Sequence, residues 1–226
     1  MNQIIGTLLP LALGISLSPF PIIMVVLILT SSRARTNSLP FMVGWVVGIG
    51  SIVTFLSFAM DALEKSTTGP AFVIAGVLRI LLGLGLLFLA YRKIRKRFGD
   101  QGETSLPGWM SSASSATPGR ALLVGLTLSA ANPKNVAITI AAGVTIGGAN
   151  LTVAAEVLSM AVFVAAASVT VIVPTAGYFV TPRLVLPLLE SIAGWLTANH
   201  QVMTGLLLLI FGTILIGNGI AGLPTA

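Results

Sequence analysis

The chain has 226 residues, of which 55% are hydrophobic and only 8% are charged, and its mean hydropathy is +1.01. This composition excludes an ordinary soluble globular protein. The absence of cysteine excludes disulfide scaffolds, thiolate metal sites and catalytic thiols. A net charge of +6 would suggest a nucleic-acid partner if the cations formed a patch on a soluble domain, but here they lie at the ends of apolar segments.

Six apolar segments are each long enough to cross a hydrocarbon core of about 30 Å at about 1.5 Å per residue. They predict an all-α integral membrane protein with six transmembrane helices. The stretch after the fifth segment mixes leucine with polar residues and is predicted to form an interfacial helix. The predicted spans are Ile4–Leu29, Leu39–Met60, Pro70–Tyr91, Ala121–Ile146, Leu151–Val180 and Val202–Leu223, and the interfacial stretch is Pro182–Asn199.

Basic residues are distributed unevenly between the segments that connect these spans. The first, third and fifth connections carry almost all of them, whereas the second and fourth together hold only Lys65. The positive-inside rule therefore predicts that the odd-numbered connections face the cytoplasm and that both termini lie outside the inner, plasma membrane. The third connection, residues 92–120, is also rich in Ser, Gly and Pro, which predicts a flexible cytoplasmic linker.

Two short stretches of the chain repeat each other. Gly14–Ser18 and Gly125–Ser129 both read Gly, Ile or Leu, Ser or Thr, Leu, Ser, and both lead into a proline. The chain thus divides into two three-helix halves, residues 1–91 and residues 121–226. Because three is odd, the second half must enter the membrane from the opposite face, which predicts the inverted-topology repeat of many secondary transporters.

The prolines in spans one and four predict broken or kinked helices. Each removes a backbone donor and frees carbonyls that hydrocarbon cannot solvate, and such backbone persists only where protein covers it or it lines a wet cavity. Paired breaks therefore predict a substrate site near the midplane, with a packing kink that binds nothing as the alternative. The predicted substrate-binding residues are Ser18, Pro19, Pro21, Ser129, Asn132, Pro133, Lys134 and Asn135.

The ionisable residues inside the spans suggest further roles. Lys134 lies about 20 Å along span four, where a charge costs about 2.5 to 3.5 kcal/mol, so it is expected to clamp the freed carbonyls of the first break or to contact a ligand. Arg79 needs a counter-charge, for which Glu156 and Asp61 are the candidates; such a pair would be a structural bridge, an external gate or a proton-sensitive latch. Glu156 is the best candidate for proton coupling.

Small residues in span two bear on assembly. Gly44 and Gly48 form a GxxxG pattern, which is expected to allow close packing within the chain rather than to form a dimer seam. The sequence leaves undecided whether the protein forms a homo-oligomer. No metal site and no cofactor are expected.

These residues suggest a family. The Ser18–Pro21 break, the matching Asn132–Asn135 segment, six spans and a basic central loop together resemble the LysE exporter superfamily. Within it they are most similar to the GAP family, the glycolipid and peptidoglycolipid addressing proteins, which are Sap-like. The resemblance implies an inner-membrane transport protein that moves cell-envelope lipids or small solutes outward.

The leading hypothesis is a secondary transporter that works by alternating access between two inverted halves. Lys134 and Arg79 would attract the anionic group of an amphipathic envelope lipid or of a small solute. An amino acid exporter is the alternative that the superfamily implies. A non-transporting scaffold for a lipid-export machine is another, and deletion of Gly99–Pro118 would separate it from a transporter, which should still move substrate. No enzyme is expected, because the chain has no Gly-rich nucleotide loop, His pair or Ser-His-Asp set.

Overall fold

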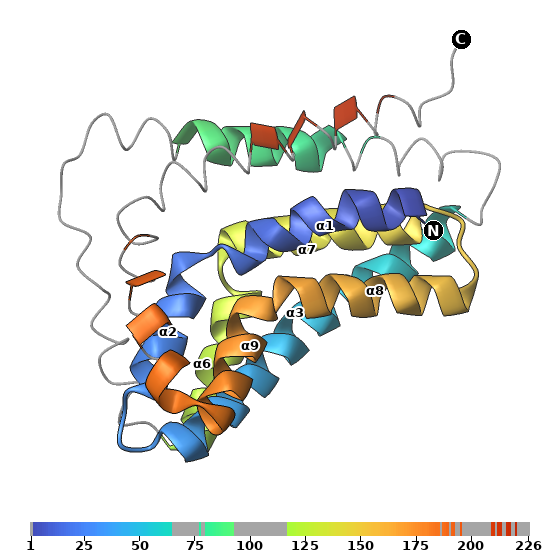
Figure 1. The fold of residues 1–226 in the computed structure, drawn as a ribbon. Coiled ribbons are helices and arrows are strands. Elements are labelled where there is room, and N and C mark those ends of the chain that lie inside the picture. The colour runs from blue at the N-terminus through green and yellow to red at the C-terminus, as the bar shows by residue number, and fades with distance from the viewer. Residues whose placement is uncertain are drawn as a thin grey trace, which may run out of the picture.

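The structure is a computed structural model, and all of its described secondary structure is helical (Figure 1). It describes residues 2–64, 77, 80–92, 117–185, 187–189, 191–192, 195, 209–210, 212–213, 216–217 and 220. The helices, in chain order, are α1 (Asn2–Ser16), α2 (Pro19–Leu29), α3 (Ala34–Glu64), a shorter apolar helix (Ile80–Arg92), α6 (Pro118–Ala130), α7 (Pro133–Gly147), α8 (Val153–Ala167) and α9 (Val169–Val180).

The breaks that the prolines predict in spans one and four are confirmed. The axis bends by 56° between α1 and α2, and α6 ends at Ala130 before α7 begins at Pro133. Pro19 and Pro133 stand in the first turn of α2 and of α7, where a missing N–H costs no helical hydrogen bond. The prolines therefore start new helices rather than interrupt old ones.

The predicted span Leu151–Val180 contains a break that the sequence did not predict. The axis bends by 65° between α8 and α9. The amide of Ser168 donates to the carbonyls of Val164 and Ala165, and its own carbonyl accepts from Val171 and Ile172. Ser168, with φ −101° and ψ 1°, thus ends one helix and starts the next in a backbone conformation that lies outside the α-helical region.

By length and apolar composition, one helix among the described residues, Ala34–Asp61, can cross a membrane by itself. The number rises to three if the bent pairs α1–α2 and α8–α9 each count as one broken span. The third predicted span is described only as Val77 and Ile80–Arg92, and the sixth only at isolated helical positions. The linker residues 93–116 lie outside the described residues.

The outer surface of the described helices is apolar, and polar side chains lie inside them beside the hydrophobic core. Large apolar side chains face outward, for example Phe55 at 72% exposed and Phe88 at 60%. Polar side chains are buried among the helices, including Ser57, Lys134 and Glu156. This arrangement is what an apolar solvent favours, since polar groups there must find partners inside the protein. The chain is a membrane protein.

Helix α3 is the centre of the packing. Figure 1 shows it running past two groups of helices, with α1, α7 and α8 in one group and α2, α6 and α9 in the other. Glycines on both helices allow α3 and α6 to approach backbone to backbone: a Cβ on Gly44 of α3 would meet the carbonyl oxygen of Leu122, and a Cβ on Gly125 of α6 would meet that of Phe41. The predicted role of Gly44 and Gly48 in packing within the chain is confirmed, because Gly48 lies against Ser129 of α6.

A Gly44→Ala substitution is expected to lower the free energy of unfolding by about 1 to 3 kcal/mol, because the added methyl group must push the α6 backbone away. Gly50→Ala is the matched control on the same helix, since a Cβ there meets nothing within 4 Å, and it should gain up to about 1 kcal/mol from helix propensity. Unfolding in mixed detergent micelles, followed by circular dichroism, measures both. Equal effects of the two substitutions would contradict the close approach of α3 and α6.

Candidate functional site

The first break leaves carbonyls of α1 without their helical donors. In a continuous helix the carbonyl of Gly14 would accept from the amide of Ser18, but that amide donates instead to Ile15 at 3.0 Å. Ile15 needs this bond because Pro19 has no N–H to give. The carbonyls of Gly14 and Ser16 are therefore left to find donors elsewhere, which water could supply on a surface but hydrocarbon cannot.

Two side chains from distant parts of the chain supply those donors. The ammonium nitrogen Nζ of Lys134 lies 2.7 Å from the carbonyl oxygen of Gly14, and the hydroxyl of Thr170 lies 2.7 Å from that of Ser16. Lys134 belongs to α7 and is only 8% exposed, while Thr170 belongs to α9. The clamp role predicted for Lys134 is thus the arrangement that the structure shows.

The second break is joined to the first by a pair of side chains. The side-chain oxygen of Asn132 caps α7 by accepting from the amide of Lys134 at 3.1 Å. Asn135, one residue further on, accepts from the hydroxyl of Ser18 at 3.1 Å and donates to the carbonyl of Leu128 at 3.4 Å. That carbonyl would accept from Asn132 if α6 continued, so Asn135 replaces a lost helical bond and ties α7 to the first break.

The third break adds a polar group that the sequence analysis did not identify. Ser168 is fully buried, and its hydroxyl has no hydrogen-bond partner among the described residues. Thr170, which bonds to α1, follows it by two positions. A signal for this break was available, because Ser168 and Thr170 are polar residues inside a long apolar stretch that also contains Pro174.

The predicted substrate-binding residues are brought together in part. Ser18, Lys134 and Asn135 meet where the first two breaks face each other. Asn132, Pro19 and Pro133 form the starts of the helices beside them, and Pro21 is buried in the first turn of α2. Ser129 lies at the interface of α6 with α3, where its hydroxyl donates to Leu126 of its own helix at 2.9 Å.

Of the predicted gating and coupling residues, the structure describes Glu156 and Asp61. Glu156 is buried in the first turn of α8 and accepts from the hydroxyl of Ser57 at 2.6 Å. It precedes Ser168 by about 18 Å along the helix. Asp61 lies in the last turn of α3 and is partly exposed. Arg79, the predicted partner of Glu156, lies outside the described residues.

The arrangement concentrates hydrogen-bonding groups in an apolar interior. An ammonium group, an amide and two hydroxyls, contributed by three broken spans, bond one another or the backbone carbonyls at the ends of α1 and α6. Such a set can receive an anionic or hydrogen-bonding group that competes with the backbone carbonyls for the same donors.

Replacing Thr170 by Val is expected to cost about 1 to 3 kcal/mol of stability, because the carbonyl of Ser16 then loses its donor from α9. Thr145→Val is the matched control, since the Thr145 hydroxyl donates within its own helix, to Ala141. Its effect should stay within about 0.5 kcal/mol. Urea-dependent proteolysis in detergent compares the two proteins, and a Thr170 variant as stable as the control would mean that the bond to α1 contributes nothing.

Comparison with known proteins identifies a family for the chain. The sequence profile of Sap, the sulfolipid-1-addressing protein, matches residues 8–221. No curated protein and no solved structure matches the chain. Because the profile spans nearly the whole sequence, the chain belongs to the Sap (sulfolipid-1-addressing protein) family.

Proposed function

We propose that the chain is an inner-membrane secondary transporter of the LysE type, which moves an anionic amphipathic envelope lipid, or a small anionic solute, by alternating access. The observation that carries the proposal is the joining of three broken spans by Lys134, Thr170 and the Ser18–Asn135 pair. Membership of a family linked to sulfolipid addressing supports a lipid-related role.

Each break can act as a hinge, because only a few hydrogen bonds connect the helix ends there. A neutral hydrogen bond contributes only about 0.5 to 1.5 kcal/mol net, so the bonds at Ser16, Ser18 and Leu128 are weak enough to exchange. A substrate that prefers one arrangement of the halves shifts the population toward it by its difference in affinity. Alternating access then requires the helices to turn about the breaks while their interiors stay intact.

Lys134 makes an anionic group the preferred substrate feature. Its ammonium is buried and bonds a neutral carbonyl, that of Gly14. A carboxylate, phosphate or sulfate would pair a full negative charge with the ammonium, which is a stronger contact than the one with a neutral carbonyl. Substrate arrival would therefore release the Gly14 carbonyl and loosen the first break. The clamp and the ligand contact are two states of one side chain.

The local geometry of the breaks supports two related halves. Ser18 and Asn132 are both N-caps, and each is followed by a proline that starts a helix. Aligning these starts places Pro19 on Pro133 and Pro21 on Asn135. In this alignment the two Gly–Ser motifs are out of register by three residues. Gly14 lies five residues before Pro19, whereas Gly125 lies eight residues before Pro133. With the basic connections inside, this repeat would have inverted topology and both termini outside.

Glu156 is the proposed coupling carboxylate. It is buried beside Ser57 at the opposite end of α8 from the third break, so α8 connects the carboxylate to the hinge. Proton binding there would change the bond to α3 and shift α8.

Lys134→Met should abolish transport, because it removes the anion-binding charge. The measurement is uptake and efflux in liposomes under an imposed pH gradient, with a fluorescent anionic lipid and an amino acid panel in parallel. Lys134→Arg, which keeps the cation, is the control and should retain part of the activity. Unchanged transport in a normally expressed Lys134→Met protein removes the proposed role. If the unmodified protein moves no substrate at all, the scaffold reading is favoured.

Glu156→Gln should leave counterflow exchange intact but abolish accumulation driven by the pH gradient, since the amide cannot carry a proton. Asp61→Asn tests the other predicted carboxylate in the same assay and should leave gradient-driven accumulation unchanged. A Glu156→Gln protein that still responds to the gradient would exclude this residue as the coupling group.

A further inference from the structure

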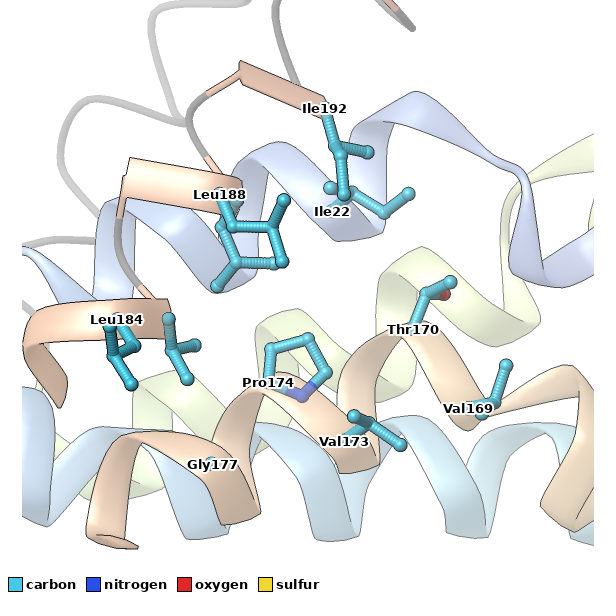
Figure 2. Close-up of a pocket in the computed structure, with 11 residues that line it drawn as sticks. Ile22, Val169, Thr170, Val173, Pro174, Gly177, Leu184, Leu188 and Ile192 are labelled. Carbon is cyan, nitrogen blue, oxygen red and sulfur yellow. The ribbon is translucent and has the colours of Figure 1, made fainter. Parts of the chain in front are cut away.

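An apolar cavity of about 400 Å³ lies between α2, α9 and the described residues of 184–192 (Figure 2). Nearly all of its lining is hydrocarbon, with Ile22 of α2 and Leu188 of the segment after α9 on one side and Pro174 of α9 on the other. Val173 is 60% exposed and Leu188 is 62% exposed, so the cavity opens sideways onto the apolar surface of the protein. In a membrane this opening faces lipid chains.

A second cavity, of about 560 Å³, has basic residues in its lining. It lies where the turn between α2 and α3 meets the start of α6, and it contains Arg33 and Arg35 together with Tyr178. The two cavities share the last turn of α9, because Gly177 lines the apolar one and Tyr178, the next residue, lines the basic one. Arginines at the end of membrane helices lie at the level of the lipid headgroups.

We propose that these two cavities form one binding site for an anionic membrane lipid, with the headgroup at Arg33 and Arg35 and an acyl chain lying along α9. Two guanidinium groups match the phosphate or sulfate of such a headgroup. The apolar lining from Val169 to Gly177 extends about 12 Å along the helix. A soluble anion would leave this lining empty, and a zwitterionic lipid would bring its own cation beside the two arginines together with its phosphate.

The deep end of the apolar cavity reaches the helix breaks. Thr170 lines the cavity and also donates to the carbonyl of Ser16. An acyl chain in the cavity would therefore contact the hinge between α8 and α9. The role of this site as the place where cargo loads from the cytoplasmic leaflet rests on the proposed function, whereas lipid binding itself does not.

The test uses the purified full chain in phosphatidylcholine nanodiscs. A phosphatidylglycerol with a photoreactive acyl chain is compared with a phosphatidylcholine that carries the same chain, and mass spectrometry maps the labelled peptides. We expect both to label α9 and residues 184–192, with the acidic lipid strongly preferred. Arg33→Gln with Arg35→Gln should reduce that preference by about 30-fold, or about 5-fold for each arginine.

The controls separate charge from shape. Arg92→Gln removes a cation that lines neither cavity and should leave the preference unchanged. Val173→Trp should fill the apolar cavity and reduce labelling by both lipids, whereas Val180→Trp, at an exposed position on the same helix outside the cavity, should not.

Three results would overturn the proposal: a preference that survives loss of both arginines, labelling that survives Val173→Trp, or displacement of the acidic lipid by inorganic phosphate alone. The last would indicate a site for a soluble anion. Lys134→Met should keep the labelling pattern while losing transport. Labelling without any transport by the unmodified protein would thus reject the proposed function and leave the lipid site standing.

Discussion

The structure depends on the hydrogen bonds made by the backbone carbonyls at the C-terminal end of α1. Water would satisfy them on a surface, but an apolar surrounding cannot, and an unpaired buried acceptor costs about 1 to 3 kcal/mol. Lys134 and Thr170 provide the donors at Gly14 and Ser16. Because they belong to α7 and α9, meeting this local need brings together segments that lie more than a hundred residues apart.

Close helix packing holds these segments in place. The glycines that face one another between α3 and α6 let the two backbones meet, and Gly143 and Gly147 let α7 approach the second half of α3. Lipid offers no hydrophobic drive for helices to associate, so contact area at small residues supplies much of the stabilisation. The movement about the breaks that the proposed mechanism requires would leave these packed helix faces intact.

The same breaks connect the two binding features of the protein. Thr170 stands at the meeting point, because it bonds to α1 on one side and lines the apolar cavity beside α9 on the other. Arg33 and Arg35 line the basic cavity, whereas Lys134 bonds the carbonyl of Gly14 at the first break. In the proposed function, cations at both places suit an amphipathic anion better than a neutral or a purely polar solute.

The sequence by itself determined the membrane class, the helical fold and the breaks at Pro19 and Pro133, because hydropathy and the missing proline N–H are local properties. It also singled out Ser18, Lys134 and Asn135, since polar residues beside a break in an apolar segment are costly unless they are used. Only the tertiary structure decided which donor meets which carbonyl, the partner of Glu156, the break at Ser168 and the cavity along α9. These features depend on how helices far apart in the chain pack together, and helix packing depends on three-dimensional contacts that no local pattern encodes.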